Sequence, residues 1–375
     1  MRRVLVFLTG SLGDTLIAIP ALRRIRAQLK DGDRISVLYD VKADARARLD
    51  SVLEEQGLVD EFIAYQLRPH VRGMREVVRV WRVIRRGKFD AVVYLLSSER
   101  RHLAVMRDKF FFVLSGIRRL DGFFAFSAAE VYPRDENGRL VQVASEAQFR
   151  LRRVDGRPAT AEELERAAQI TIPNAASARV ANFLHSAPGA GREDEGLIAL
   201  APGAKQPSCR WPLDRFREIG ARILSRGLGQ VVIVGSAAER PMAAELLAAW
   251  GGGMDATGEL SAVESGALLA RCRLLVGNDT GTTHLAAAVG TPVVAVFSAR
   301  DHPGRWHPIG RRHEIIRESP PCEGCHALVC PVEGHPCIAE IMVDEVWSAV
   351  EQVLGQPDRS SNDRDQVSGS SRRDP

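Results

Sequence analysis

The chain has 375 residues, of which 45% are hydrophobic and 26% charged, and its formal net charge is +4. This length accommodates two domains, the composition is typical of a globular protein, and the small net charge by itself indicates neither a nucleic-acid nor a membrane partner. No apolar run approaches the roughly 18 residues of a membrane-spanning helix, and no signal peptide is apparent at the start, so we expect a cytoplasmic protein.

The first half of the chain alternates strand-like apolar runs with helix-like stretches. Strands are expected at 4–8, 35–39 and 90–96, and helices at 20–28, 43–55 and 73–86. Thr160 and Glu163 have the spacing of a capping box, which predicts a further helix over 160–168. This alternation is typical of βαβ units in a mostly parallel sheet.

A second α/β pattern follows a connector at 186–196, which is rich in Gly, Pro and charged residues. Its expected strands are 197–201, 230–234, 274–276 and 293–297, and its expected helices are 213–225, 239–250, 262–270, 282–289 and 344–354. We therefore predict an N-terminal domain over 1–185, a linker over 186–196, a C-terminal domain over 197–354 and a disordered polar tail over 355–375.

Two tight turns, 9–14 and 277–284, each follow a predicted strand and precede a predicted helix. Ligands of open α/β sheets bind at such strand ends, where helix N-termini offer free N–H groups to anions. Neither turn is a dinucleotide-binding G-x-G-x-x-G or a Walker A loop, which disfavours a simple dehydrogenase or P-loop NTPase. Two such edges indicate two domains that face each other across a ligand cleft.

Three segments together carry a family resemblance: the turn Gly10–Asp14, the pair Pro202-Gly203-Ala204 and Arg210-Trp211-Pro212, and the stretch Asp279–Ala287. In this order they resemble glycosyltransferase family 9, the ADP-heptose:lipopolysaccharide heptosyltransferases, over most of residues 1–354. The resemblance implies a GT-B architecture, which is two Rossmann-like domains with the active site between them. It also implies an inverting, metal-independent transfer of a heptose or similar sugar from an ADP-sugar to a lipopolysaccharide core precursor, with no cofactor and with possible peripheral contact at the inner membrane.

The resemblance assigns the catalytic base to Asp14 and the acceptor-side turn to Ser11 and Gly13. A carboxylate there would take the proton of the acceptor hydroxyl as that oxygen attacks the sugar. The alternative is structural, because Asp is also a favoured helix N-cap.

The resemblance places the donor-binding residues in the second half: Gly203, Lys205, Arg210, Glu239, Asp279, Thr280, Gly281 and His284. Asp279 corresponds to the residue that holds the donor sugar, Thr280 and Gly281 to the turn around the diphosphate, and Glu239 to the acid that accepts from the ribose. Each of three residues also has a structural alternative. Asp279 could be a helix N-cap, Glu239 could compensate the helix dipole, and His284 could simply pack on its helix. The family's usual lysine near the Trp-Pro pair is missing, so either Lys205 or Arg210 would neutralise the diphosphate.

Two features have open interpretations. Cys322, Cys325, Cys330 and Cys337 could bind zinc or simply lie in a proline-stiffened loop, and we assign no metal ligand. Residues 68–88 carry eight basic side chains against one acid, Glu76. They form either an ordinary amphipathic helix or a basic surface for anionic lipid or phosphorylated sugars.

Two other functions remain open. One is a GT-B transferase with another nucleotide sugar or a protein acceptor, and the other is a non-catalytic binding protein. Asp14 and Asp279 together favour an enzyme, because a degenerate binder has no need of both.

Overall fold

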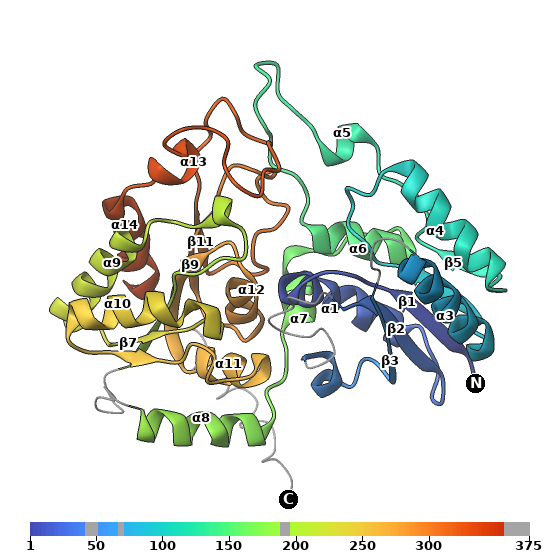
Figure 1. Ribbon diagram of the computed structural model, residues 1–375, viewed down its shortest axis with the longest axis horizontal. Helices are drawn as coiled ribbons and strands as arrows, with labels where there is room; N and C mark the ends of the chain where they lie inside the picture. Colours follow the sequence, from blue (N-terminus) through green and yellow to red (C-terminus); the bar gives the residue numbers. More distant parts are fainter. Residues whose placement is uncertain (42–51, 67–70, 188–195, 356–375) are drawn as a thin grey trace, which may run out of the picture.

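The computed structural model describes residues 1–41, 52–66, 71–187 and 196–355, and it contains two parallel sheets, each covered by helices (Figure 1). The expected α/β architecture of two Rossmann-like domains, the GT-B arrangement, is confirmed. Most of the helix expected at 43–55, most of the linker and the polar tail beyond Gly355 lie outside the described residues.

The first sheet has the strand order β3-β2-β1-β4-β5, and all neighbours are parallel. Its central strand β1 is buried on both faces, which explains its unbroken apolar sequence. In the register, Val6 lies opposite Val37 on one side and Val93 on the other. The strands are β1 (Arg3–Phe7), β2 (Arg34–Asp40), β3 (Glu61–Tyr65), β4 (Ala91–Tyr94) and β5 (Arg119–Asp121).

The helices around this sheet include several that the sequence did not predict. α1 begins at Leu12 rather than at Pro20, because Ser11 caps it; Pro20 lies inside the helix. The capping box of Thr160 and Glu163 is confirmed at the start of α7. The elements are α1 (Leu12–Ala27), η1 (Glu54–Gln56), α3 (Val71–Gly87), α4 (His102–Leu114), α5 (Ala128–Val131), α6 (Glu146–Asp155), α7 (Ala161–Ala168) and α8 (Asn174–Ser186).

The second sheet has the order β11-β10-β9-β6-β7-β8 and is also parallel throughout. The strands expected here are confirmed to within two residues at each end. The strands are β6 (Leu197–Ala201), β7 (Gln230–Ile233), β8 (Met254–Asp255), β9 (Cys272–Asn278), β10 (Val293–Val296) and β11 (His313–Ile316).

The helices of the second half agree closely with the expected ranges. Trp211 lies in the apolar core beneath α9 and is 2% exposed. The elements are η3 (Pro207–Cys209), α9 (Leu213–Ser225), η4 (Ala237–Glu239), α10 (Arg240–Trp250), α11 (Ala262–Leu269), α12 (Gly281–Ala288), α13 (Pro336–Ala339) and α14 (Val343–Gly355).

The two sheets share one apolar core where α1 contacts α12. Leu16 of α1 and Leu285 of α12 belong to the same buried cluster. Helix α8 precedes the connector but packs against α11 of the second half, below the second sheet in Figure 1. The domain limits drawn from the sequence stay a prediction. Within the described residues, no helix is both long and apolar enough to cross a membrane.

Candidate active site

A cleft of about 810 Å³ lies between the two halves of the molecule. The first half lines it with the turn at 10–14 and with Glu99, and the second half with the turns that follow β6, β7 and β9. Every site residue named from the sequence lines this cleft except Arg210. The expectation that ligands bind at the C-terminal ends of parallel strands therefore identified the residues that line the cleft, while the role of each residue stays a prediction.

Asp14 is the third residue of α1, not its N-cap, so the capping alternative needs correction: Ser11 is the N-cap. The Asp14 Oδ2 atom accepts hydrogen bonds from the Ser11 backbone N–H at 2.8 Å and from the Ser11 hydroxyl at 3.0 Å. Gly10, with φ of +135°, makes room for this carboxylate, since a Cβ there would lie 2.3 Å from Asp14 Cγ. The turn thus holds one carboxylate oxygen toward the helix end.

A buried cation supports Asp14 from behind. Arg150 of α6 is 1% exposed; it donates to the Asp14 carbonyl oxygen, and its Nη2 lies 3.4 Å from Asp14 Oδ1. Its Nε lies 3.5 Å from Glu146, which also accepts from the Ser98 N–H and hydroxyl at 2.9 and 2.7 Å. Burial raises the pKa of Glu146, against the opposing effect of Arg150. This pair was not expected from the sequence, because α6 was not predicted.

The N-termini of α1 and α12 meet across the cleft, and glycine permits the contact. A Cβ on Gly13 would lie 2.8 Å from His284 Cδ2, and a Cβ on Gly281 would lie 3.0 Å from Leu12 Cβ. Burial lowers the pKa of His284 to about 4, so this imidazole is neutral near pH 7. The cleft wall therefore combines two sets of helix-terminal N–H groups with a neutral histidine.

Asp279 precedes α12 at the end of β9, and Thr280 rather than Asp279 is the N-cap. Burial, together with the nearby charges of Asp301 and Asp14, raises the pKa of Asp279 to about 7, although Arg300 acts in the opposite direction. The hydroxyl of Thr280 is buried and has no hydrogen-bond partner among the described residues. A ligand in the cleft can use both groups.

Glu239 lies where the turns after β6 and β7 converge. A Cβ on Gly203 would lie 2.1 Å from Glu239 Oε1, and a Cβ on Gly235 would lie 2.7 Å from Oε2. The Glu239 Oε2 atom accepts from the Ser236 N–H at 2.6 Å. Both glycines are thus required by the carboxylate, which faces the cleft beside Leu260 and Ala262.

Lys205 lines the cleft, whereas Arg210 supports the turn that carries it. Arg210 Nε donates to the Ala204 carbonyl oxygen at 2.9 Å. Asn278 stabilises the same turn, since its Nδ2 donates to the Pro202 carbonyl oxygen at 2.8 Å and its Oδ1 accepts from the Trp211 N–H at 3.1 Å. Of these two cations, only Lys205 lines the cleft.

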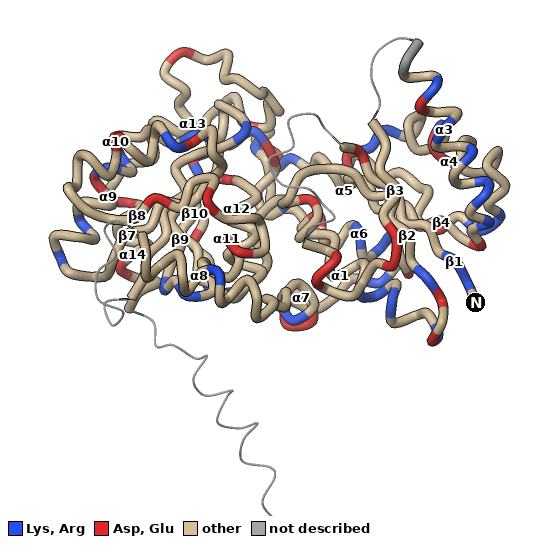
Figure 2. Tube along the Cα trace, turned by 60° about the horizontal axis from the view of Figure 1, so that its bottom comes forward, with Lys and Arg blue, Asp and Glu red and all other residues tan. Residues whose placement is uncertain are grey.

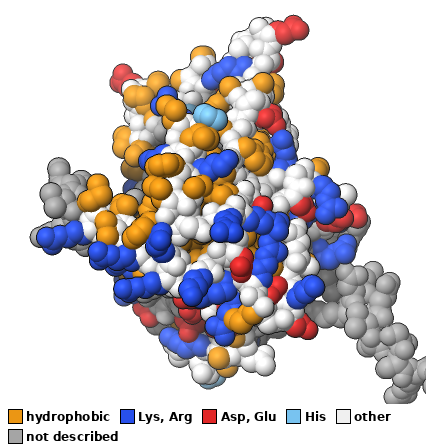
Figure 3. Space-filling model, turned by 90° about the vertical axis from the view of Figure 1, so that its right-hand side faces the viewer, with side chains coloured by type: hydrophobic (Ala, Val, Ile, Leu, Met, Phe, Trp, Pro, Cys, Tyr) orange, Lys and Arg blue, Asp and Glu red, His pale blue; other side chains and the backbone are white. Residues whose placement is uncertain are grey.

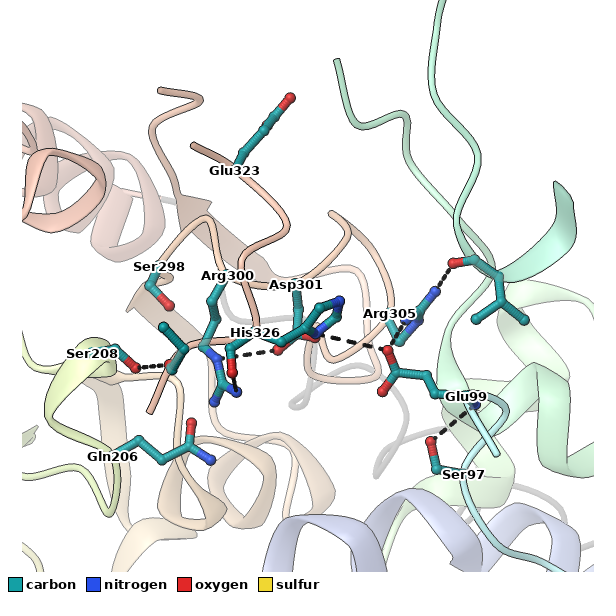
Figure 4. Close-up of polar contacts among 12 residues, drawn as sticks. Ser97, Glu99, Gln206, Ser208, Ser298, Arg300, Asp301, Arg305, Glu323 and His326 are labelled. Carbon is teal, nitrogen blue, oxygen red and sulfur yellow. Dashed lines mark hydrogen bonds and ion pairs between the residues drawn. The ribbon is translucent and has the colours of Figure 1, made fainter. Parts of the chain in front are cut away.

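Charged residues from both halves meet at one end of the cleft, and the sequence did not identify them (Figure 4). Glu99 accepts from Arg305, which is fully buried and also donates to the Val131 carbonyl oxygen. His326 Nδ1 lies 2.9 Å from Asp301 Oδ1 and 4.0 Å from Glu99 Oε1. The hydrogen bond to Asp301 raises the pKa of His326.

The loop that carries Arg305 is bound to the first half by its backbone as well. The Val143 N–H donates to the Pro303 carbonyl oxygen at 2.9 Å, and the Glu146 N–H donates to the Arg305 carbonyl oxygen at 2.8 Å. These contacts join segments more than 150 residues apart in the chain. No local sequence pattern marks such pairs, which explains why they were missed.

Two groups of side chains could be considered for a metal. Within the described residues, Glu99, Asp301 and His326 are the one group of three whose ligating atoms lie within 4.8 Å of one another, and they already form ion pairs. Cys322, Cys325, Cys330 and Cys337 line a small cavity of about 40 Å³ together with His335. No three of these sulfurs lie within 4.8 Å of one another, so only the sequence spacing and this shared cavity favour the zinc interpretation.

Comparison with known proteins agrees with this geometry. The model of glycosyltransferase family 9 (heptosyltransferase) matches residues 139–335. Lipopolysaccharide heptosyltransferase 2 of Salmonella typhimurium is 33% identical over 127 residues, and that of Escherichia coli K12 is 32% identical over 127 residues. Each match covers 32% of this chain and 36% of the relative, so the chain spans about a third of the length of these relatives.

Solved structures share the fold over nearly the whole chain. The family 9 glycosyltransferase of Veillonella parvula has a TM-score of 0.67 at 19% identity and covers 94% of this chain and 97% of its own. E. coli ADP-heptose lps heptosyltransferase II has a TM-score of 0.64 at 20% identity, with 94% and 98% covered. E. coli heptosyltransferase WaaC, solved with ADP, has a TM-score of 0.59 at 17% identity, with 94% and 99% covered.

Proposed function

Because the chain belongs to glycosyltransferase family 9, we propose that it transfers a heptose, or a similar sugar, from an ADP-sugar to a lipopolysaccharide core precursor. The relatives that suggest this reaction are named as lipopolysaccharide heptosyltransferases. One observation carries the proposal: two helix N-termini meet across a single cleft, with Asp14 in the first turn of one and Asp279 directly before the other.

The cleft supports an inverting displacement. The oxygen of the acceptor hydroxyl attacks C1 of the sugar, the bond from C1 to the diphosphate oxygen breaks, and ADP leaves from the opposite face. Asp14 takes the hydroxyl proton, since its carboxylate lines the cleft and is held there by hydrogen bonds from the Ser11 N–H and hydroxyl. Arg150 positions Asp14 and does not itself face the cleft.

The donor would lie on the second half. Lys205, Arg300 and the first residues of α12 line the cleft, where their charges and N–H groups would stabilise the diphosphate. Glu239 would accept from the ribose hydroxyls, and Leu260 and Ala262 offer an apolar wall for the adenine. The structurally similar E. coli heptosyltransferase WaaC was solved with ADP, which supports an ADP-sugar as the donor class.

We also propose that transfer needs no divalent ion, since N–H groups and cations can stabilise the leaving diphosphate electrostatically. The rate of transfer should be unchanged in EDTA. If EDTA abolished transfer and magnesium or manganese restored it, the proposed metal independence would be wrong, but the proposed transfer reaction would stand. Release of zinc with loss of folding would instead identify the four-cysteine loop as a metal site.

Thermal unfolding of the full chain with ADP tests the donor site. At a hundred times its dissociation constant, a ligand adds about 2.7 kcal/mol to the free energy of unfolding. ADP should therefore raise the melting temperature more than UDP does, and Lys205→Ala should weaken ADP binding. Lys30→Ala, far from the cleft, is the matched control. Equal stabilisation by UDP would contradict an adenine site.

The acceptor in this proposal is anchored in lipid, so the reaction would take place at the cytoplasmic face of the inner membrane with peripheral contact. Transfer from ADP-heptose to a purified core precursor tests the reaction itself. A product that forms equally fast on a protein acceptor would favour the alternative GT-B transferase.

A further inference from the structure

Helix α4 presents an apolar stripe to solvent. Leu103, Met106, Phe110 and Val113 follow one another at spacings of three and four, which puts them on one side of the helix. Leu103 is 79% exposed and Phe110 is 64% exposed. The opposite side of the same helix, with Val105 and Phe112, is buried in the core of the first half.

A helix that is apolar on both sides is normally covered on both sides. Single exposed apolar side chains are ordinary, but a continuous stripe marks an interaction surface. From Leu103 to Val113 the stripe runs for about 15 Å at the rise of an α-helix. Within the described part of the chain, nothing covers it.

Helix α3 lies beside α4 and supplies the charge. Trp81 Nε1 donates to the Leu114 carbonyl oxygen at 3.2 Å, and the Arg85 guanidinium lies 5.3 Å from the Trp81 ring centre. Arg82 and Arg86 are exposed and form no ion pair with any described residue. Figure 2 shows Lys and Arg recurring along the two helices, and Figure 3 shows hydrophobic and basic side chains interleaved on this side of the molecule.

We propose that the face formed by α3 and α4 docks on an anionic lipid bilayer. The stripe of α4 enters the boundary between headgroups and acyl chains, while the arginines of α3 contact lipid phosphates. The apolar stripe lies beside exposed arginines that pair with no described residue, which suits an anionic bilayer because apolar burial and charge attraction then act together. A protein partner would have to supply a matching acidic rim.

The position of α4 links this face to the cleft. Glu99 lines the cleft and stands three residues before His102, where α4 begins. The N-terminal end of α4 therefore begins near the cleft, and a bilayer on this face would border the first half of the molecule, where we place the acceptor. This inference rests on the peripheral contact in the proposed function and names the face that makes it. Vesicle binding is measured without donor or acceptor, so the docking face and the transfer reaction can fail separately.

Sedimentation with vesicles tests the proposal on the full chain. Vesicles of phosphatidylcholine and phosphatidylglycerol in a two-to-one ratio are compared with vesicles of phosphatidylcholine alone. One variant removes the stripe, Leu103→Ser/Met106→Ser/Phe110→Ser, and another reverses charge, Arg82→Glu/Arg86→Glu. Met342→Ser and Arg217→Glu/Arg271→Glu, exposed positions in the second half, are the matched controls.

The wild type should bind the anionic vesicles and lose binding at high salt. The charge variant should bind about thirtyfold more weakly or worse, at roughly tenfold for each 1.4 kcal/mol and about 1 kcal/mol for each cation. The stripe variant should bind at least about tenfold more weakly. Absence of binding by the wild type, or equal binding by variants and controls, would overturn the proposal. So would a wild-type dimer that Phe110→Ser dissociates without any vesicle binding.

Discussion

Replacing Asp14 by Asn separates its proposed chemical role from its structural one. The amide oxygen can still accept from the Ser11 N–H and hydroxyl, which lie 2.8 and 3.0 Å from Asp14 Oδ2. The amide nitrogen would then face Arg150 Nη2, which is 3.4 Å from Asp14 Oδ1. Arg150 keeps its bond to the Asp14 carbonyl oxygen and its pairing with Glu146, so the stability loss should stay near 1 kcal/mol.

The loss in catalysis should be larger. A general base contributes about 10²–10⁴-fold to the rate, and a hundredfold loss corresponds to about 2.7 kcal/mol of transition-state stabilisation. We therefore expect Asp14→Asn to bind ADP normally, melt only slightly below the wild type and turn over at least about a hundredfold more slowly.

The assay is the turnover number for transfer at saturating donor, with the melting temperature and ADP binding measured on the same preparations. Glu163→Gln is the matched control, because Glu163 occupies the same third helical position in a capping box far from the cleft. Near-normal turnover of Asp14→Asn would refute the reasoning, reduce Asp14 to a helix-capping residue and place the base elsewhere.

Three further substitutions follow from the packing around the cleft. Gly13→Ala puts a Cβ 2.8 Å from His284 Cδ2, so the N-termini of α1 and α12 must move apart, and turnover and ADP affinity should fall. Gly252→Ala is the control, because a Cβ there meets nothing within 4 Å and should change neither quantity. The pKa of Asp279 is raised to about 7 in the folded state, whereas in the unfolded state this carboxyl loses its proton at about pH 4. Between these two pH values the folded state binds more protons, so the contribution of Asp279 to the free energy of unfolding falls as pH rises. Melting temperatures of Asp279→Asn at pH 5 and pH 8 should therefore fall less with rising pH than those of the wild type, and parallel curves would contradict the shift. Arg150→Met leaves Glu146 buried without its cation and should cost about 3–5 kcal/mol in denaturant unfolding. The double variant Arg150→Met/Glu146→Gln should recover part of that loss, and no recovery would mean that the two residues are not coupled.

The sequence predicted the inner strands of both sheets, because buried parallel strands are continuous apolar runs bounded by turns. It missed β3, β5, β8 and β11, which are the edge strands of the two sheets. It also located the turns that line the cleft, since strand ends and helix starts have local signals at 10–14, 202–205 and 279–284. Helix α4 was missed because apolar side chains on its outer side erase the helical period that would reveal it.

Contacts between remote segments could not be predicted in this way. Arg150 joins Asp14 across 136 positions, and Arg305 joins Glu99 across 206. Their side chains are charged, and charged residues on a sequence are read as surface residues unless the partner is known. The sequence likewise did not show which of Lys205 and Arg210 lines the cleft, because the turn sequence does not specify where each side chain lies.

The bridge at Arg305 has a mechanical consequence. Its guanidinium is fully buried and belongs to the second half, while its acceptors, Glu99 and the Val131 carbonyl oxygen, belong to the first. If the two halves moved apart, the buried Arg305 guanidinium would lose both acceptors at once, which is unfavourable in free energy. We therefore expect the two halves to unfold together, in one transition rather than two.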